Sequence, residues 1–139
     1  MKQVFLASDG STHALNATKE VVKLGEGFPE MKVTVITVID TSEIKSAALD
    51  FKSDRDLLHL KRLQKIEKTL HLLKEANIPH KVEILQGDPA ENIIQYVVEN
   101  HADMLILGNR GLNSLQEMVL GSVSHKIIKQ ADCPVLVLK

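Results

Sequence analysis

The sequence predicts an α/β fold, an open parallel sheet of five strands with helices on both faces. Three observations lead there. Short apolar runs typical of strands alternate with stretches of helical periodicity along the whole chain. The 139 residues fit a single domain, residues 1–139, that is large enough to bury a core. A glycine-rich loop follows the fourth apolar run and precedes the last helical pattern.

The first half of the chain opens with a buried strand at residues 4–7, followed by helical periodicity through residue 24. Gly25 is well placed to end that helix. Residues 33–39 are β-branched almost throughout, which predicts a central strand. From Asp40 to about Ser53 no single period holds, and we interpret this segment as variable, a candidate flap over the site.

A long helix is predicted next, because Ser53 and Asp56 resemble a capping box. An apolar stripe runs along it, formed by Leu57, Leu60, Leu63, Ile66, Leu70 and Leu73. We expect the stripe to pack on the protein's own sheet; a coiled-coil partner is the alternative. Asn77, Ile78 and Pro79 break the helix, and residues 81–85 alternate like a strand.

The next helix has a strong start, with Asp88 as N-cap, Pro89 at the first position and Glu91 at the third. We interpret Gly87, Asp88 and Pro89 as structural for this reason. Its expected core positions are Ile93, Ile94, Val97 and Val98. Residues 104–107 form the fourth predicted strand, and Val135–Leu138 closes the chain as the fifth.

Composition excludes several classes of protein. A net charge of −1, dispersed Lys and Arg and no Trp argue against a nucleic-acid surface. No run approaches the roughly 20 apolar residues of a membrane helix, so a cytoplasmic location is the expectation. The single Cys133 excludes an internal disulfide, and the six histidines show no metal-ligand spacing. We expect no protein-built metal site.

The glycine-rich loop carries the functional signal. Gly108 and Gly111 follow a strand, and Gly121 and Ser122 precede a helix whose apolar face is expected at Val123, Ile127, Ile128 and Ala131. Glycine N–H groups and a helix N-terminus favour phosphate, and Ser122 and Ser124 add hydroxyl donors. The simpler interpretation is a strand–helix turn with a serine cap. The loop is not a P-loop, because Ser122 stands where that motif needs lysine.

The spacing Gly-x2-Gly-x9-Gly-Ser resembles the ATP-binding signature of the universal stress protein family. The opening residues 4–11 and the closing residues 133–138 are similar to the first and last strands of that family. The resemblance runs from end to end and implies a Rossmann-like fold of the adenine nucleotide alpha hydrolase type with strand order 3-2-1-4-5. In that order the chain reverses its direction of winding between the first and fourth strands, and the loops at 8–11 and 108–122 lie side by side at that point. Open α/β sheets bind their ligands beside such a reversal, at the carboxyl ends of the strands.

The resemblance also implies roles for single residues. Asp9 would contact the adenosine part of ATP. From the residues alone, Asp9 could instead be the N-cap of the first helix, a role that Ser11 could also fill. Val38 matches a position whose backbone contacts adenine; from the residues alone it is a core valine. The candidate binding residues are Asp9, Val38, Gly108, Arg110, Gly111, Gly121, Ser122, Val123 and Ser124. A magnesium ion would arrive with the phosphates, held by ligand oxygens and water.

Three functions remain open on the sequence. The first is a regulatory, nucleotide-binding homodimer in a stress response, pairing through its last strand and acting on an unidentified protein. The second is a slow ATP-hydrolysing enzyme, for which Arg110, Asp9 and His125 are the only candidate groups; we expect no catalytic residue beyond these. The third is an interaction module that binds no nucleotide, which the intact glycine signature argues against.

Overall fold

The computed structural model describes residues 1–41, 44, 51–108 and 121–139. Their framework is a five-stranded sheet in the order β3-β2-β1-β4-β5, and all four neighbouring pairs are parallel. The strands are β1 (Gln3–Ala7), β2 (Lys32–Asp40), β3 (His80–Gly87), β4 (Met104–Gly108) and β5 (Val135–Leu138). Both the fold class and the strand order are confirmed.

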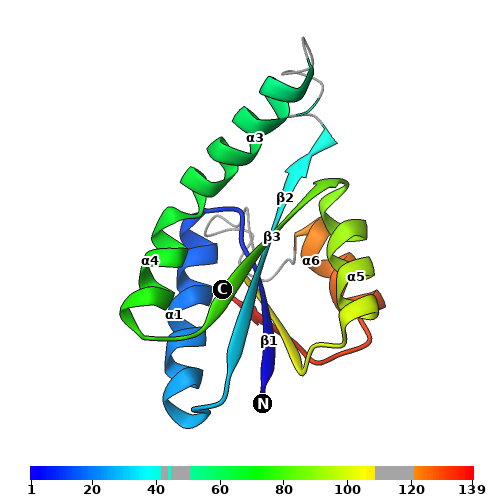
Figure 1. The fold of residues 1–139 in the computed structure, drawn as a ribbon. Coiled ribbons are helices and arrows are strands. Elements are labelled where there is room, and N and C mark those ends of the chain that lie inside the picture. The colour runs from blue at the N-terminus through cyan, green and yellow to red at the C-terminus, as the bar shows by residue number, and fades with distance from the viewer. Residues whose placement is uncertain (42–43, 45–50, 109–120) are drawn as a thin grey trace.

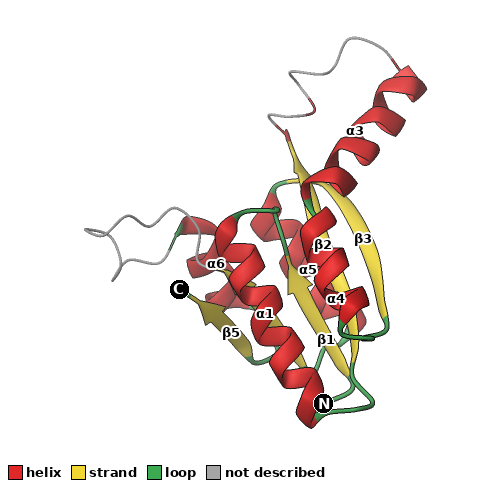
Figure 2. Cartoon of the chain, turned by 90° about the vertical axis from the view of Figure 1, so that its left-hand side faces the viewer, coloured by secondary structure: helices red, strands yellow, loops and turns green. Residues whose placement is uncertain are grey.

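Helices cover both faces of the sheet, as Figure 1 shows. Helices α1 (Thr12–Gly27) and α4 (Glu67–Glu75) lie on one face. Helices α5 (Pro89–Asn100) and α6 (Ser122–Gln130) lie on the other. Helix α3 (Phe51–Lys65) departs from this layering and projects beyond the end of the sheet where β2 finishes (Figures 1 and 2).

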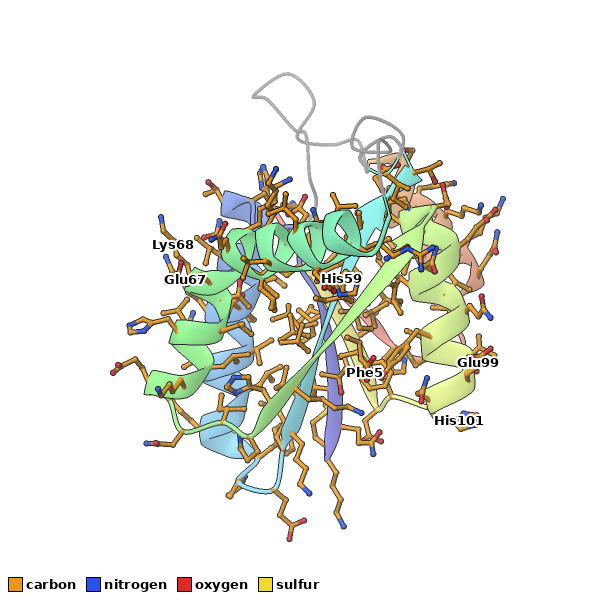
Figure 3. The ribbon with its side chains drawn as sticks, turned by 45° about the horizontal axis from the view of Figure 1, so that its top comes forward. Phe5, His59, Glu67, Lys68, Glu99 and His101 are labelled. Atoms are coloured by element: carbon orange, nitrogen blue, oxygen red, sulfur yellow. The ribbon has the colours of Figure 1, made fainter. Side chains whose placement is uncertain are left out.

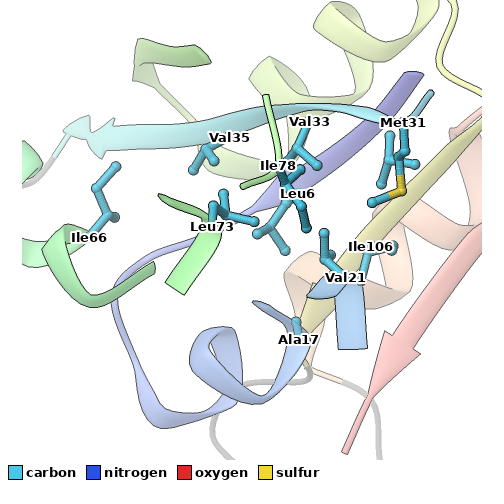
Figure 4. Close-up of a cluster of buried hydrophobic side chains, with 11 residues drawn as sticks. Leu6, Ala17, Val21, Met31, Val33, Val35, Ile66, Leu73, Ile78 and Ile106 are labelled. Carbon is cyan, nitrogen blue, oxygen red and sulfur yellow. The ribbon is translucent and has the colours of Figure 1, made fainter. Parts of the chain in front are cut away.

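Two apolar clusters fill the layers, one on each side of the sheet. The cluster beneath α1 and α4 includes Val33 and Val35 from β2 (Figure 4), and the cluster beneath α5 and α6 includes Ile36 and Val38. Residues 33–39 of β2 are all buried. A strand covered on both faces needs apolar residues at nearly every position, which is why the sequence reads as a β-branched run.

The predicted start of α5 is confirmed. The Asp88 carboxylate accepts the backbone N–H of Glu91 at 3.0 Å, and Pro89 occupies the first turn, where its missing N–H costs nothing. Helix α1 begins in the same manner, because the Ser11 hydroxyl accepts the N–H of Ala14 at 3.2 Å.

The predicted end of α1 at Gly25 is wrong, because the helix continues to Gly27. A β-carbon at Gly25 would come within 3.0 Å of the Ile78 side chain. The glycine therefore allows the helix to pack closely against the segment before β3, and it does not terminate the helix.

The predicted long helix is also wrong in three respects. It begins at Phe51, so Ser53 lies inside α3 and is not its cap. It is broken at Ile66, whose φ of −100° and ψ of 11° separate α3 from α4. Leu57 and Leu60 are 46% and 54% exposed, whereas Ile66 and Leu73 are fully buried. The apolar stripe continues across the break, but only the part that follows the break faces the core.

Three further residues predicted to face the core are exposed: Val98 on α5, and Val123 and Ile128 on α6. Each lies at the margin of its helix's apolar stripe, while Val97 and Ile127 at the centre of the stripes are fully buried. On α6 the second buried side chain is Ser124, which the apolar pattern did not predict.

Among the described residues, no helix is both long and apolar enough to span a bilayer.

The two halves of the leucine stripe should differ in stability. We expect Leu73→Ala to lower the free energy of unfolding by about 2–5 kcal/mol, because a fully buried side chain leaves a cavity. The matched control, Leu60→Ala on exposed α3, should change it by less than about 1 kcal/mol. Urea denaturation measures both, and equal losses would contradict the packing described above.

Candidate functional site

A cleft of about 430 Å³ opens at the carboxyl ends of the strands, beside the switch point between β1 and β4. This is the edge at which open α/β sheets bind ligands. It is formed by the ends of β1, β2 and β4, by the N-terminal turns of α1, α5 and α6, and by the last turn of α3. Its described lining consists of Ala7, Ser8, Asp9, Ala14, Ile36, Val38, Asp40, Arg62, Lys65, Asp88, Pro89, Ile93, Leu107, Gly108, Val123, Ser124 and Ile127.

The loop after β1 holds Asp9 in the cleft without using it as a helix cap. Its carboxylate accepts the backbone N–H of Ser11 at 2.9 Å, and Ser11 itself caps α1. The Ser8 hydroxyl accepts the N–H of Gly10 at 3.3 Å, and Gly10 has a φ of 81°. These bonds define a tight turn, and they remove the capping explanation of Asp9 that the sequence left open.

Buried hydroxyl groups support this loop from below. The Ser8 and Thr69 hydroxyl oxygens are 3.4 Å apart, and Thr69 lies 3.2 Å from the Thr18 hydroxyl. Thr18 donates to the carbonyl oxygen of Ala14 at 2.8 Å, so the chain of hydroxyls ends on α1. Since buried polar groups are costly unless hydrogen-bonded, this network fixes the β1 loop relative to α1 and α4.

Gly108 ends β4 and is required by packing. A β-carbon there would come within 2.9 Å of the backbone nitrogen of Ala14 and would also overlap the carbonyl group of His13. Only a residue without a side chain lets the start of α1 lie directly against the end of β4. Gly108 therefore has a structural explanation independent of any ligand, and it lines the cleft as well.

Helix α6 points its N-terminus at the same cleft. Gly121 is the N-cap residue, with a φ of −61°, and no side chain of the described residues caps the helix. The first amide N–H groups of a helix have no partner within it. With the positive end of the helix dipole, those of the first turn of α6 form an arrangement that favours an anion. Val123 and Ser124 line the cleft, and Ser124 is buried.

The remaining predicted residues differ in their placement. Val38 lines the cleft from β2, as expected. Ser122 is exposed at the first position of α6 and is not among the lining residues. Arg110 and Gly111 lie outside the described residues. The binding role of each residue stays a prediction.

Two cationic side chains in the cleft were missed from the sequence. Arg62 and Lys65 stand on α3 and line the cleft wall opposite α5 and α6. The backbone carbonyl of Lys65 meets Gly10, where a β-carbon would overlap it. The sequence predicted that the leucine stripe of α3 faces the core, and therefore that Arg62 faces solvent. The structure reverses this, since Arg62 is 7% exposed.

Carboxylates complete the rim. Asp40 at the end of β2 and Asp88 at the start of α5 line the cleft together with Asp9. Asp88 caps α5 and also lines the cleft. No group of three or more His, Cys, Asp or Glu side chains suited to a metal ion occurs in the part of the chain that the structure describes.

Cys133 is not part of this site. It precedes β5, is half-buried, and packs against the apolar cluster beneath α5 and α6. Burial, and secondarily the neighbouring Asp132 carboxylate, raise the pKa of the Cys133 thiol. The thiol therefore stays protonated at neutral pH, which is unsuited to a nucleophile.

The family model described as the universal stress protein family matches residues 1–139. The chain belongs to the universal stress protein family. A universal stress protein of Thermus aquaticus is 30% identical to it over 140 residues, which is 99% of this chain and 98% of that one. The solved structure of MJ0577, a universal stress protein of Methanocaldococcus jannaschii, is 30% identical, with a TM-score of 0.81 and coverage of 99% and 95% of the two chains.

Three similar structures of universal stress proteins contain adenine nucleotides. An Arabidopsis thaliana protein with AMP is 20% identical, with a TM-score of 0.70 over 100% of this chain and 91% of that one. An Archaeoglobus fulgidus protein with dAMP is 19% identical, with a TM-score of 0.71 and coverage of 100% and 98%. A complex with cAMP is also 19% identical, with a TM-score of 0.70 and coverage of 99% and 96%. At these identities they establish the fold.

The packing role of Gly108 can be tested against a glycine with open surroundings. We expect Gly108→Ala to lower the free energy of unfolding by about 1–3 kcal/mol, because the new methyl group overlaps the α1 backbone. Gly27→Ala should be nearly neutral, since a β-carbon at Gly27 meets nothing within 4 Å. Thermal unfolding followed by circular dichroism compares the two, and a neutral Gly108→Ala would contradict the close approach.

Proposed function

We propose that this universal stress protein is a regulatory protein that binds ATP in the cleft at the carboxyl ends of its strands. One observation carries the proposal. Five of the residues selected from the sequence for nucleotide binding, Asp9, Val38, Gly108, Val123 and Ser124, line a single cleft, although they come from four separate parts of the chain. The adenine nucleotides held by three relatives of the same fold support it.

The phosphates would lie on main-chain donors. The first turn of α6, which begins at Ser122, presents amide N–H groups, and Ser124 in the same turn lines the cleft. Such donors suit phosphate because they need no compensating charge of their own. Gly111, Arg110 and Ser122 belong to the same proposed phosphate site on sequence grounds.

The adenosine part would extend from there toward β2. Asp9 lies in the loop after β1, the strand between β4 and β2, where its carboxylate can accept hydrogen bonds from ribose hydroxyls or from the base amino group. Val38 would provide an apolar surface and backbone groups for adenine. A magnesium ion, where present, would be held by phosphate oxygens and water.

We infer a binding role and not a catalytic one, in a cytoplasmic setting where ATP is abundant. Hydrolysis of ATP needs a base or charge stabiliser positioned at the γ-phosphate. His125 is exposed on α6, and it does not line the cleft. A slow ATPase on this scaffold remains the second hypothesis, and multiple-turnover measurements with Arg110→Ala as control separate it from contamination.

Ligand identity should be visible in the purified protein. We expect native mass spectrometry of freshly purified protein to release ATP, and calorimetry to show ATP binding that Gly121→Ala weakens about tenfold. The φ of −61° at Gly121 accommodates alanine, so the fold should survive while the added methyl crowds the phosphates. Gly27→Ala is the matched control. Unchanged affinity in Gly121→Ala would contradict the phosphate site, and release of AMP or cyclic AMP would reassign the nucleotide.

The proposal includes a homodimer. Strand β5 is an edge of the sheet, pairs only with β4 in the described chain, and is apolar over all of its residues Val135–Leu138. An apolar edge strand is a template for pairing with a second chain. We expect sedimentation velocity at micromolar concentration to show a dimer that pairs antiparallel through β5, and a monomer at that concentration would contradict it.

A further inference from the structure

Arg62 is the feature of the cleft that the proposed function leaves unused. It is a buried charged residue of α3, 7% exposed, on a helix whose opposite face carries exposed leucines. A guanidinium is always charged at neutral pH and carries five N–H donors in a planar fork. Because Arg62 lines the cleft, these donors are placed where a bound ligand can reach them.

The position of the guanidinium group is fixed from one side. Its Nε donates to the hydroxyl of Thr37 at 2.7 Å, in a buried contact between α3 and β2. Because a guanidinium is planar with donors in a rigid fork, this bond helps to orient the group. Lys65, one turn further along α3, meets the β1 loop at Gly10 and keeps the end of the helix in place.

The strand order shows which half of a nucleotide Arg62 would meet. Phosphates on the N-terminus of α6 lie beside the end of β4, whereas Thr37 belongs to β2, with β1 between the two. Neighbouring strands are about 4.8 Å apart, so β2 and β4 are separated by about 10 Å. That separation is about the length of a nucleoside, which puts Arg62 at the adenosine half of the cleft, together with Val38 and Asp40.

We propose that the guanidinium of Arg62, held by Thr37, contacts the adenosine half of the bound nucleotide and contributes to its recognition. This inference rests on the proposed nucleotide-binding function. The guanidinium provides N–H donors for the ring nitrogens of the base or the oxygens of the ribose. It also joins ligand recognition to α3.

Ligands with and without phosphate groups test the adenosine half and the phosphate half of the cleft separately. Calorimetry with adenosine, AMP and ATP should show Arg62→Gln losing about tenfold or more in affinity for all three, the magnitude of a hydrogen bond to a charged group. Ser124→Ala, at the phosphate end, should lose affinity for ATP and retain its affinity for adenosine. Thr37→Val should show a smaller loss of about threefold to tenfold, again for all three ligands, because the guanidinium is present but no longer oriented.

Two controls keep a folding defect apart from a binding defect. Lys61→Gln removes the same charge from the neighbouring, exposed residue of α3 and should bind all three ligands like the wild type. Arg62→Lys keeps the charge and removes the planar fork, so it should remain impaired; it replaces Arg62→Gln if circular dichroism shows that the latter does not fold.

The outcomes are distinct. Wild-type affinity for adenosine in Arg62→Gln, or a loss confined to AMP and ATP, overturns the role given to Arg62 while leaving nucleotide binding in place. Full restoration of affinity by Arg62→Lys overturns the oriented contact. If the wild-type protein binds none of the three ligands, the proposed function fails and this inference fails with it.

Discussion

The parallel pairing of β1 with β4 is the constraint on which the rest of the molecule depends. It aligns Ala7 with Leu107, residues a hundred positions apart in the chain, and so brings the β1 loop beside the end of β4. The chain winds from β1 outward to β2 and β3 and must then cross back to form β4 and β5. The helices that follow β1 and β4 diverge to opposite faces, and the cleft is the space that this divergence leaves.

Two glycines make that constraint sterically possible. Gly108 lets the start of α1 lie against the end of β4, and Gly10, with its φ of 81°, lets the end of α3 lie against the β1 loop. At both places the neighbour is backbone, which cannot move aside as a flexible side chain could. In the cleft wall, these two glycines are therefore required for close packing. The absence of a side chain also leaves main-chain groups accessible to a ligand.

The charge distribution of the cleft suits a ligand that is neutral at one end and anionic at the other. The main-chain donors at the N-terminus of α6 favour an anion without any fixed positive charge. Carboxylates of Asp9, Asp40 and Asp88 share the lining with the cations of Arg62 and Lys65, so the side chains as a set carry no excess of positive charge. The charged side chains of the lining, taken alone, would therefore attract a purely anionic ligand only weakly. A nucleotide would place its nucleoside among the mixed charges and its phosphates on the helix.

The sequence by itself determined the elements whose signals are local. The β-branched run of β2, the Asp88 and Pro89 start of α5 and the strand–glycine–helix pattern around Gly108 and Gly121 depend on residues close together in the chain, and the strand order came from the family resemblance. Only the tertiary structure decided which side of α3 is inside. The buried positions Arg62, Ile66, Thr69 and Leu73 share one helical face, and Leu57 and Leu60 lie away from it. Helical periodicity predicts which residues share a face, but it does not show that α3 projects beyond the sheet, where its leucines have no core to face. Arg62 and Lys65 thus became visible as cleft residues only when the chain was folded, since their partners Thr37 and Gly10 are brought to them by the sheet.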